Sequence, residues 1–92
     1  MRIVWDEPKR LWNREKHALD FNDLDEDFFA DAMVVQAKER RLKAVGFLSP
    51  DVIAVIFAIL GQEGISIVSM RPASRRERRL YEEFQNKNSD PH

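Results

Sequence analysis

The sequence predicts an α+β domain in which an antiparallel meander sheet packs against two N-terminal helices and one C-terminal helix. Apolar residues recur at helical spacing at both ends of the chain, the middle consists of strand-like segments, and the loops between those segments are short. With 92 residues, of which 43% are hydrophobic, the chain can form one small core. We therefore expect a single domain over residues 1–85 and a disordered tail over 86–92, which contains no apolar residue.

The N-terminal third predicts one strand and two helices. A short β-prone run precedes Asp6, which can cap a helix, and Pro8, which suits the first turn of a helix. Asn22 or Asp23 can cap the second helix. The expected elements are a strand over 2–5, a helix over 8–18 with Leu11 and Trp12 on its apolar side, and a helix through Ala30 with Leu24, Phe28 and Phe29 on its apolar side. Both tryptophans, Trp5 and Trp12, are expected in the core.

The middle of the chain predicts four strands in a meander. Val52 to Leu60 is a nearly continuous apolar run, which is typical of a central strand with a neighbour on each side. Turn sequences at 49–51 and 61–64 bracket this run. We expect helices to cover one face of the sheet. The expected strands span residues 33–38, 41–47, 52–60 and 65–70.

The last predicted element is a helix that follows Pro72. Ser74 is a candidate cap, and Glu77 three residues later completes the capping-box spacing. Its apolar side comprises Ala73, Leu80, Tyr81 and Phe84.

Several function classes are excluded by composition. The chain has no cysteine, which excludes disulfide scaffolds, zinc ribbons and thiol chemistry, and its two histidines cannot build a His-rich metal site. No P-loop, dinucleotide-binding, serine-hydrolase or zincin motif is present. The sequence shows no targeting or membrane-spanning segment, so we expect a cytoplasmic protein with no metal, no cofactor and no membrane contact.

The net charge of −1 argues against a protein that coats nucleic acid, but the charges are segregated. Residues 1–31 hold five basic and nine acidic side chains, whereas 38–43 hold four basic and one acidic, and 71–83 hold five arginines and three glutamates. Two interpretations stay open. The basic clusters can form a patch for a phosphate ligand or an acidic partner, or they can be solvated surface.

The strongest candidate site is a run of arginines. Arg71 ends the last predicted strand, and Arg75 and Arg76 lie in the first turn of the next helix, where the helix dipole disfavours cations. Because arginine suits bidentate phosphate recognition, we expect these three guanidinium groups to converge on one shallow concave surface. Such converging like charges predict that Arg71→Ala is neutral or slightly stabilising. In the alternative, Glu77, Glu82 and Glu83 pair with the arginines at i+3 and i+4 spacing on an exposed helix.

A second candidate is His17, next to Lys16 near the end of the first helix. Histidine can donate and accept protons near neutral pH. The alternative is a structural histidine that the helix dipole favours.

The chain resembles the BrnT family of bacterial toxins over about Ile3 to Tyr81. The residues that carry the resemblance are Trp5-Asp6…Lys9…Asn13…Lys16-His17…Phe21…Phe29-Ala30-Asp31, Arg41…Ala44…Gly46, and Ile67-Val68-Ser69-Met70-Arg71-Pro72-Ala73…Arg75-Arg76-Glu77-Arg78…Tyr81. The chain has Ala18, Ser66 and Met70 where the family usually has glycine, a basic residue and alanine.

The resemblance implies a RelE-like fold and the toxin of a type II toxin–antitoxin system. It implies a metal-independent endoribonuclease that inhibits translation and is neutralised by a BrnA-like antitoxin, whose ribbon-helix-helix module makes any contact with DNA. Arg71, Arg75 and Arg76 are expected to stabilise charge, His17 to act as acid or base, and Tyr81 to orient a base or phosphate or else to pack on the sheet. The expected RNA-binding residues are Lys16, Arg41, Lys43, Arg78 and Arg79. The alternative function is a non-catalytic binding module whose arginine cluster holds an acidic protein partner.

Overall fold

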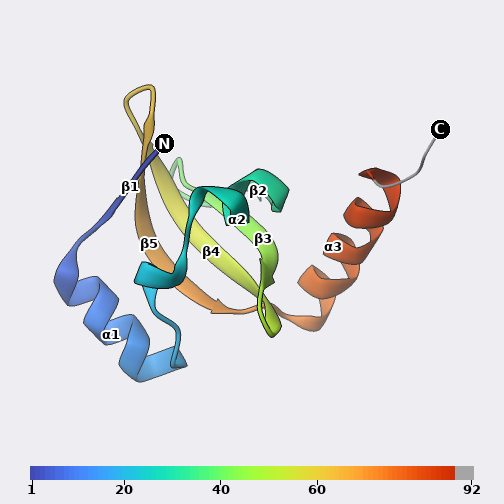
Figure 1. The fold of residues 1–92 in the computed structure, drawn as a ribbon, viewed down its shortest axis with the longest axis horizontal. Coiled ribbons are helices and arrows are strands. Elements are labelled where there is room, and N and C mark those ends of the chain that lie inside the picture. The colour runs from blue at the N-terminus through green and yellow to red at the C-terminus, as the bar shows by residue number, and fades with distance from the viewer. Residues whose placement is uncertain (89–92) are drawn as a thin grey trace.

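The computed structural model describes residues 1–88, in which a five-stranded sheet carries helices on both faces (Figure 1). In chain order the elements are β1 (Arg2–Trp5), α1 (Glu7–His17), a 3₁₀ turn η1 (Phe21–Asp23), α2 (Glu26–Asp31), β2 (Met33–Gln36), β3 (Leu42–Leu48), β4 (Asp51–Leu60), β5 (Gly64–Pro72) and α3 (Arg75–Asn88). None of the helices in this described part is long and apolar enough to cross a membrane. The α+β class is confirmed.

The sheet has the order β1-β5-β4-β3-β2 and is mixed. Strands β2 to β5 form the expected antiparallel meander, and β4 is its central strand, flanked by β3 and β5. The prediction of a purely antiparallel sheet is wrong, because β1 pairs with β5 in parallel, Arg2 opposite Gly64. Ile3 and Trp5 pack against the core from this position. Their apolar side chains are buried only when β1 pairs with the edge of β5.

An irregularity in the β4–β5 ladder decides which way the end of β5 faces. Ile56 pairs with Ser69 and Phe57 with Ile67, which leaves Val68 as an extra residue. Both Ile67 and Met70 therefore point into the same core, although they are an odd number of residues apart. The next residue along β5, Arg71, points to the opposite face.

The two faces of the sheet bury separate apolar clusters. Ala44 of β3 belongs to the larger cluster under α1, η1 and α2, and its neighbour Val45 belongs to the smaller cluster under α3. The expectation that helices cover only one face is therefore wrong. The larger cluster comprises Phe21, Leu24, Phe28, Ala32, Ala44, Ile53, Val55, Phe57, Ile65, Ile67 and Met70, and the smaller one Val45, Ala54, Ala73 and Tyr81.

The second predicted helix divides into η1 and α2. The carboxylate of Asp20 accepts a hydrogen bond from the Asn22 backbone N–H, and that of Asp25 accepts one from Phe28 N–H. The caps are thus Asp20 and Asp25 rather than Asn22 or Asp23, because each carboxylate reaches an N–H two or three residues later. α2 packs closely on β3, where a Cβ on Gly46 would lie 3.0 Å from Phe28 Cε1.

Helix α1 buries a polar residue instead of the predicted apolar pair. Trp12 is 70% exposed and Leu11 is also exposed, whereas Asn13 is buried. Asn13 Oδ1 accepts a hydrogen bond from Met70 N–H at 3.0 Å, and Asn13 Nδ2 donates to the Leu19 carbonyl at 3.3 Å. These two bonds fix the rotation of α1, which turns Trp12 to solvent. Trp5 packs against the larger cluster, as expected.

The ends of α1 and α3 also differ from the predictions. Asp6 occupies the N-cap position of α1, but its side chain makes no capping hydrogen bond. α3 continues through Asn88, past the expected domain boundary at residue 85, and residues 89–92 of the expected tail lie outside the described residues.

Candidate functional site

The buried carboxylate of Glu77 joins three segments of the chain. Arg71, at the end of β5, donates from Nη1 to Oε1 at 2.7 Å and from Nη2 to Oε2 at 2.9 Å. Lys43 of β3 donates from Nζ to Oε2 at 2.7 Å. The Ser74 backbone N–H donates to Oε1 at 2.8 Å, and Ser74 Oγ accepts from Glu77 N–H at 3.1 Å, which confirms the predicted capping box.

Local sequence places each member of this Arg71–Glu77–Lys43 cluster. The extra residue in β5 turns Arg71 toward the α3 face. Lys43 alternates with core-facing Leu42 and Ala44 on β3, so it points to the same face. The capping box sets Glu77 at the third position of α3, directly over both cations.

The cluster keeps Glu77 ionised. Hydrogen bonds from Arg71 hold the pKa of Glu77 well below its ordinary value, with further lowering from Lys43 and the Ser74 N–H and partial opposition from burial. Glu77 in turn raises the pKa of Arg71. A carboxylate with so low a pKa is a weak general base, so Glu77 can position Arg71 and Lys43 but is poorly suited to proton transfer.

The predicted neutral or stabilising effect of Arg71→Ala assumed repulsion between arginines. Arg71 instead lies against the carboxylate of Glu77, so that assumption no longer applies. The alternative prediction is correct that Glu77 pairs with an arginine, but its i+3 and i+4 spacing is wrong for Glu77, because the partners are Arg71, six residues away, and Lys43. Helical spacing could not predict the contact with Lys43, because this residue lies on β3, 34 residues before Glu77 in the chain.

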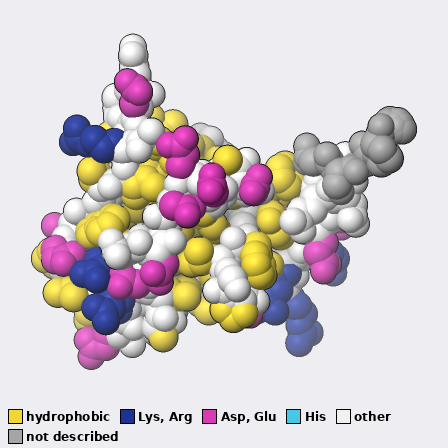
Figure 2. Space-filling view, in the orientation of Figure 1, with side chains coloured by type: hydrophobic (Ala, Val, Ile, Leu, Met, Phe, Trp, Pro, Cys, Tyr) yellow, Lys and Arg dark blue, Asp and Glu magenta, His cyan; other side chains and the backbone are white. Residues whose placement is uncertain are grey.

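The four helix arginines point in different directions from α3. The buried residues Glu77 and Tyr81 mark the face of α3 that meets the sheet. Because successive side chains of a helix are rotated by about 100°, Arg75 and Arg79 lie on the opposite side, which faces solvent. Arg76 lies on one flank and Arg78 on the other. Figure 2 shows dark blue Lys and Arg side chains gathered over the start of α3, while acidic side chains gather over α2. The convergence of Arg71, Arg75 and Arg76 on one surface stays a prediction.

The remaining basic candidates lie on other elements. Lys16 is exposed and His17 half-buried in the last turn of α1. His17 follows Asn13 by one helical turn and therefore shares its β5-facing side. Arg41 precedes β3 and lies 3.9 Å from Glu39, at the turn after β2. Among residues 1–88, no side-chain hydrogen bond or ion pair joins these three residues to the Arg71–Glu77–Lys43 cluster.

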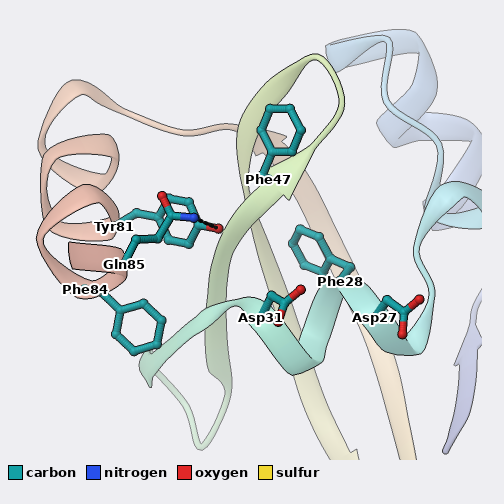
Figure 3. A pocket seen from close by; sticks show the side chains of 7 residues that line it. All are labelled: Asp27, Phe28, Asp31, Phe47, Tyr81, Phe84 and Gln85. Carbon is teal, nitrogen blue, oxygen red and sulfur yellow. Dashed lines mark hydrogen bonds between the residues drawn. The ribbon is translucent and has the colours of Figure 1, made fainter. Parts of the chain in front are cut away.

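Tyr81 lies on the sheet-facing side of α3, at a cleft separate from the Arg71–Glu77–Lys43 cluster. It is buried, stacks on Phe84 and accepts a hydrogen bond from Gln85 Nε2 at 3.1 Å. Figure 3 shows the side chains that line this cleft of about 480 Å³, with those of α2 facing those of α3 across β3. The burial of Tyr81 supports the packing alternative. The lining residues are Asp27, Phe28, Asp31, Phe47, Tyr81, Phe84 and Gln85.

Comparison with known proteins decides the family. Residues 5–77 match the family described as ribonuclease toxin, BrnT, of type II toxin–antitoxin systems. The chain belongs to the BrnT family. It is 50% identical to the Brucella abortus ribonuclease toxin BrnT, whose 1.1 Å crystal structure superimposes with a TM-score of 0.77 over 82% of this chain and 99% of that one. No protein of curated function matches the chain.

The BrnT match includes His17, Lys43, Arg71 and Glu77, and it ends before Arg78, Arg79 and Tyr81. The spacing of Glu77 to Ser74 predicts the capping box but not the contacts of Glu77 with Arg71 and Lys43. Nothing in the sequence marked Asn13 beyond its place in the family block. Within residues 1–88, no group of three or more His, Asp and Glu side chains is placed to hold a metal ion.

Proposed function

We propose that this BrnT-family chain is a cytoplasmic endoribonuclease that cleaves RNA without a metal ion and thereby inhibits translation. A BrnA-like antitoxin with a ribbon-helix-helix module neutralises it and supplies any contact with DNA. The observation that carries the proposal is the family match over residues 5–77, together with 50% identity to the Brucella ribonuclease toxin. The Arg71–Glu77–Lys43 cluster lies entirely within the matched residues.

The proposed reaction is attack of a ribose 2′-oxygen on the adjacent phosphorus. The new 2′-O–P bond forms as the P–O5′ bond breaks, a base takes the 2′-hydroxyl proton, and an acid gives a proton to the leaving 5′-oxygen. Negative charge develops on the phosphoryl oxygens and requires positioned cations.

Arg71 is the first of these cations. Glu77 accepts hydrogen bonds from two of the five N–H donors of Arg71 and fixes the plane of the guanidinium group. Nη1 also donates to the Pro72 carbonyl at 3.3 Å, and the side chain is 39% exposed. Arg75 and Arg76 supply further positive charge from the first turn of α3, and Lys16, Arg41, Lys43, Arg78 and Arg79 are assigned to RNA binding. His17 is the proposed acid or base, and Tyr81 has a weaker claim because it is buried in the other cleft.

Two observations favour the second candidate, a non-catalytic binding module. The charge of Arg71 is already matched by a carboxylate, and Ser66 stands on β5 where the family usually has a basic residue. A chain of this kind would hold an acidic partner and leave RNA intact.

The decisive experiment is induction of the chain in bacteria with and without its neighbouring antitoxin. We expect growth arrest and RNA cleavage with the toxin alone and restored growth with the antitoxin. The Arg75→Ala/Arg76→Ala double variant should lose arrest, since removal of one transition-state donor typically lowers the rate about 10²–10³-fold. The matched control is Glu82→Ala/Glu83→Ala, which changes two exposed charges on the same helix.

His17→Ala tests the proton-transfer role separately. Retained RNA cleavage in this variant removes His17 from the mechanism. Normal growth with the wild-type chain, no RNA cleavage and tight antitoxin binding would instead establish the binding module.

A further inference from the structure

Strand β2 leaves an unusually apolar edge on the sheet. Among the described residues 1–88 it pairs only with β3, and its Val34 and Val35 are 46% and 39% exposed. In an antiparallel pair, every second residue directs its N–H and C=O away from the partner strand. Within residues 1–88, no backbone hydrogen bond joins Met33–Gln36 to a strand or loop on that outer side.

Edge strands of natural proteins are usually protected by a charge, a proline or a bulge. Met33-Val34-Val35-Gln36 has none of these, so its protection is limited to its short length of four residues. The opposite edge, β1, carries Arg2, and its other three residues are partly buried. The exposed apolar edge is therefore specific to β2 and is not a general property of this small sheet.

An apolar groove continues from this edge on the α3 face. It has a volume of about 330 Å³ and lies between β2, β3 and α3. The groove is lined by Met33, Val35, Lys43, Val45, Glu77, Leu80, Glu83, Phe84 and Lys87. An extended chain on the β2 edge can place alternate side chains into this groove.

The charges around the edge restrict what can bind there. Lys38, Arg40 and Arg41 follow β2, with only Glu39 among them. Within the groove, the charges of Lys43 and Lys87 are balanced by Glu77 and Glu83, so the excess of positive charge lies at the Lys38–Arg41 end of the edge. The other end of β2 adjoins Asp31 at the end of α2. A bound segment should therefore carry acidic side chains at the Lys38–Arg41 end and apolar ones over Val34 and Val35.

We propose that the β2 edge receives an extended, apolar and acidic segment of the antitoxin as a sixth strand. This inference rests on the proposed function, which supplies the antitoxin. Strand addition satisfies the outward backbone groups, and the alternate side chains cover both exposed valines and enter the groove. A second copy of this chain is less suitable, because a four-residue edge buries far less than the roughly 1,200 Å² of a stable interface, and a folded copy cannot follow the groove.

Amide hydrogen exchange of the isotope-labelled toxin tests the site directly. The outward-facing amides of Met33–Gln36 should exchange at least tenfold more slowly in the antitoxin complex, while the amides of β1 remain unchanged. Unchanged exchange at β2 in a formed complex overturns the proposal.

Substitution provides the second measurement. Val34→Lys and Val35→Lys should each raise the Kd for the antitoxin at least tenfold without reducing RNA cleavage by the free toxin. The matched control is Ile59→Lys, an exposed β-branched residue on β4, which should leave the Kd unchanged. Equal Kd values for all three variants overturn the proposal while RNA cleavage and neutralisation still support the proposed function.

Three other outcomes also overturn the proposal. If the free toxin is a dimer that Val34→Lys dissociates, the edge serves a second copy. If RNA alone protects the β2 amides, the edge belongs to substrate binding. If the wild-type chain neither cleaves RNA nor binds the antitoxin, the proposed function fails as well.

Discussion

Glu77 shows how much one buried carboxylate can organise in a small domain. Its two oxygens accept hydrogen bonds from Lys43, Arg71 and the Ser74 N–H, so β3, β5 and α3 meet at a single side chain. The second oxygen contact of Arg71 makes the pair bidentate and fixes the guanidinium plane. Loss of Glu77 leaves two cations without their anion.

We expect Glu77→Ala to lower the free energy of unfolding by about 1–3 kcal/mol, because buried hydrogen bonds and a helix cap are lost together. Arg71→Ala should also destabilise, though less, because its side chain is partly exposed and Lys43 still contacts Glu77. Urea denaturation followed by circular dichroism measures both changes. The control is Glu82→Ala, an exposed glutamate on α3, and an equal loss in that variant would contradict the special role of Glu77.

Stability should decrease in acid. Hydrogen bonds to Arg10 and to the Asn22 N–H lower the pKa of Asp20 to about 2, and Arg71 lowers the pKa of Glu77 from its ordinary value of 4.5. Because both pKa values are lower in the folded than in the unfolded chain, the stabilisation is complete above about pH 5 and is lost as the pH falls toward 2. Urea midpoints at pH 3 and pH 6 measure this difference, and Glu77→Gln should reduce it. Equal midpoints at the two pH values would contradict these assignments.

At the scale of elements, α1 ends in an unfavourable backbone conformation. Ala18 has φ 57° and donates its N–H to the Arg14 carbonyl, which is the left-handed cap that glycine favours. A glycine at this position would adopt the same conformation without the strain that a Cβ causes.

Ala18→Gly should therefore raise the free energy of unfolding by up to about 1 kcal/mol, because the Cβ strain of the left-handed conformation disappears. The control is Ala30→Gly in α2, an exposed helical position where the same change should destabilise by about 1 kcal/mol. Thermal or urea denaturation measures both. Destabilisation by Ala18→Gly would contradict the strain at this cap.

Elements with a local signal were predictable from the sequence. The apolar run of β4, the short turns of the meander and the Ser74–Glu77 capping box each depend on neighbouring residues. The parallel pairing of β1 and the burial of Asn13 depend on β5, far along the chain, and local patterns contain no information on such contacts.

The candidate site was predictable to a similar extent. Arg71, Lys43 and Glu77 were each singled out, but their meeting depends on the extra residue Val68, which an alternating pattern does not reveal. Helical spacing predicts Tyr81 on the apolar side of α3. The cleft around Tyr81 was not predictable, because it forms only where α2 and α3 face each other across β3.

At the scale of the whole molecule, charge is unevenly distributed. Acidic side chains gather over α2, whereas basic ones gather over the start of α3 and, separately, over α1 (Figure 2). A nearly neutral chain can therefore present one face to a polyanion, because exposed charges act mainly within a Debye length of about 8–10 Å.

This division predicts a salt-dependent affinity for RNA that depends on the α3 arginines. On single-stranded RNA, each lost phosphate contact should reduce the slope of log K against log salt by about 0.7, so Arg75→Ala/Arg76→Ala should reduce it by about 1.4. The control is Lys9→Ala, an exposed cation on α1 in the acidic N-terminal region. Fluorescence anisotropy at several salt concentrations gives the slope. An equal change in the control would show that binding depends only on net charge.

The pairing of β1 with β5 also sets an order of events during synthesis. Arg2 leaves the ribosome first, but its partner Gly64 follows roughly 60 residues later, which takes about 3–12 s at 5–20 residues per second. The anchor of α1 has a similar wait, since Asn13 bonds to Met70, 57 residues later. The first strand and helix thus remain unpaired until most of the chain has been translated, and a nascent chain that stops before Gly64 has no edge on which β1 can fold.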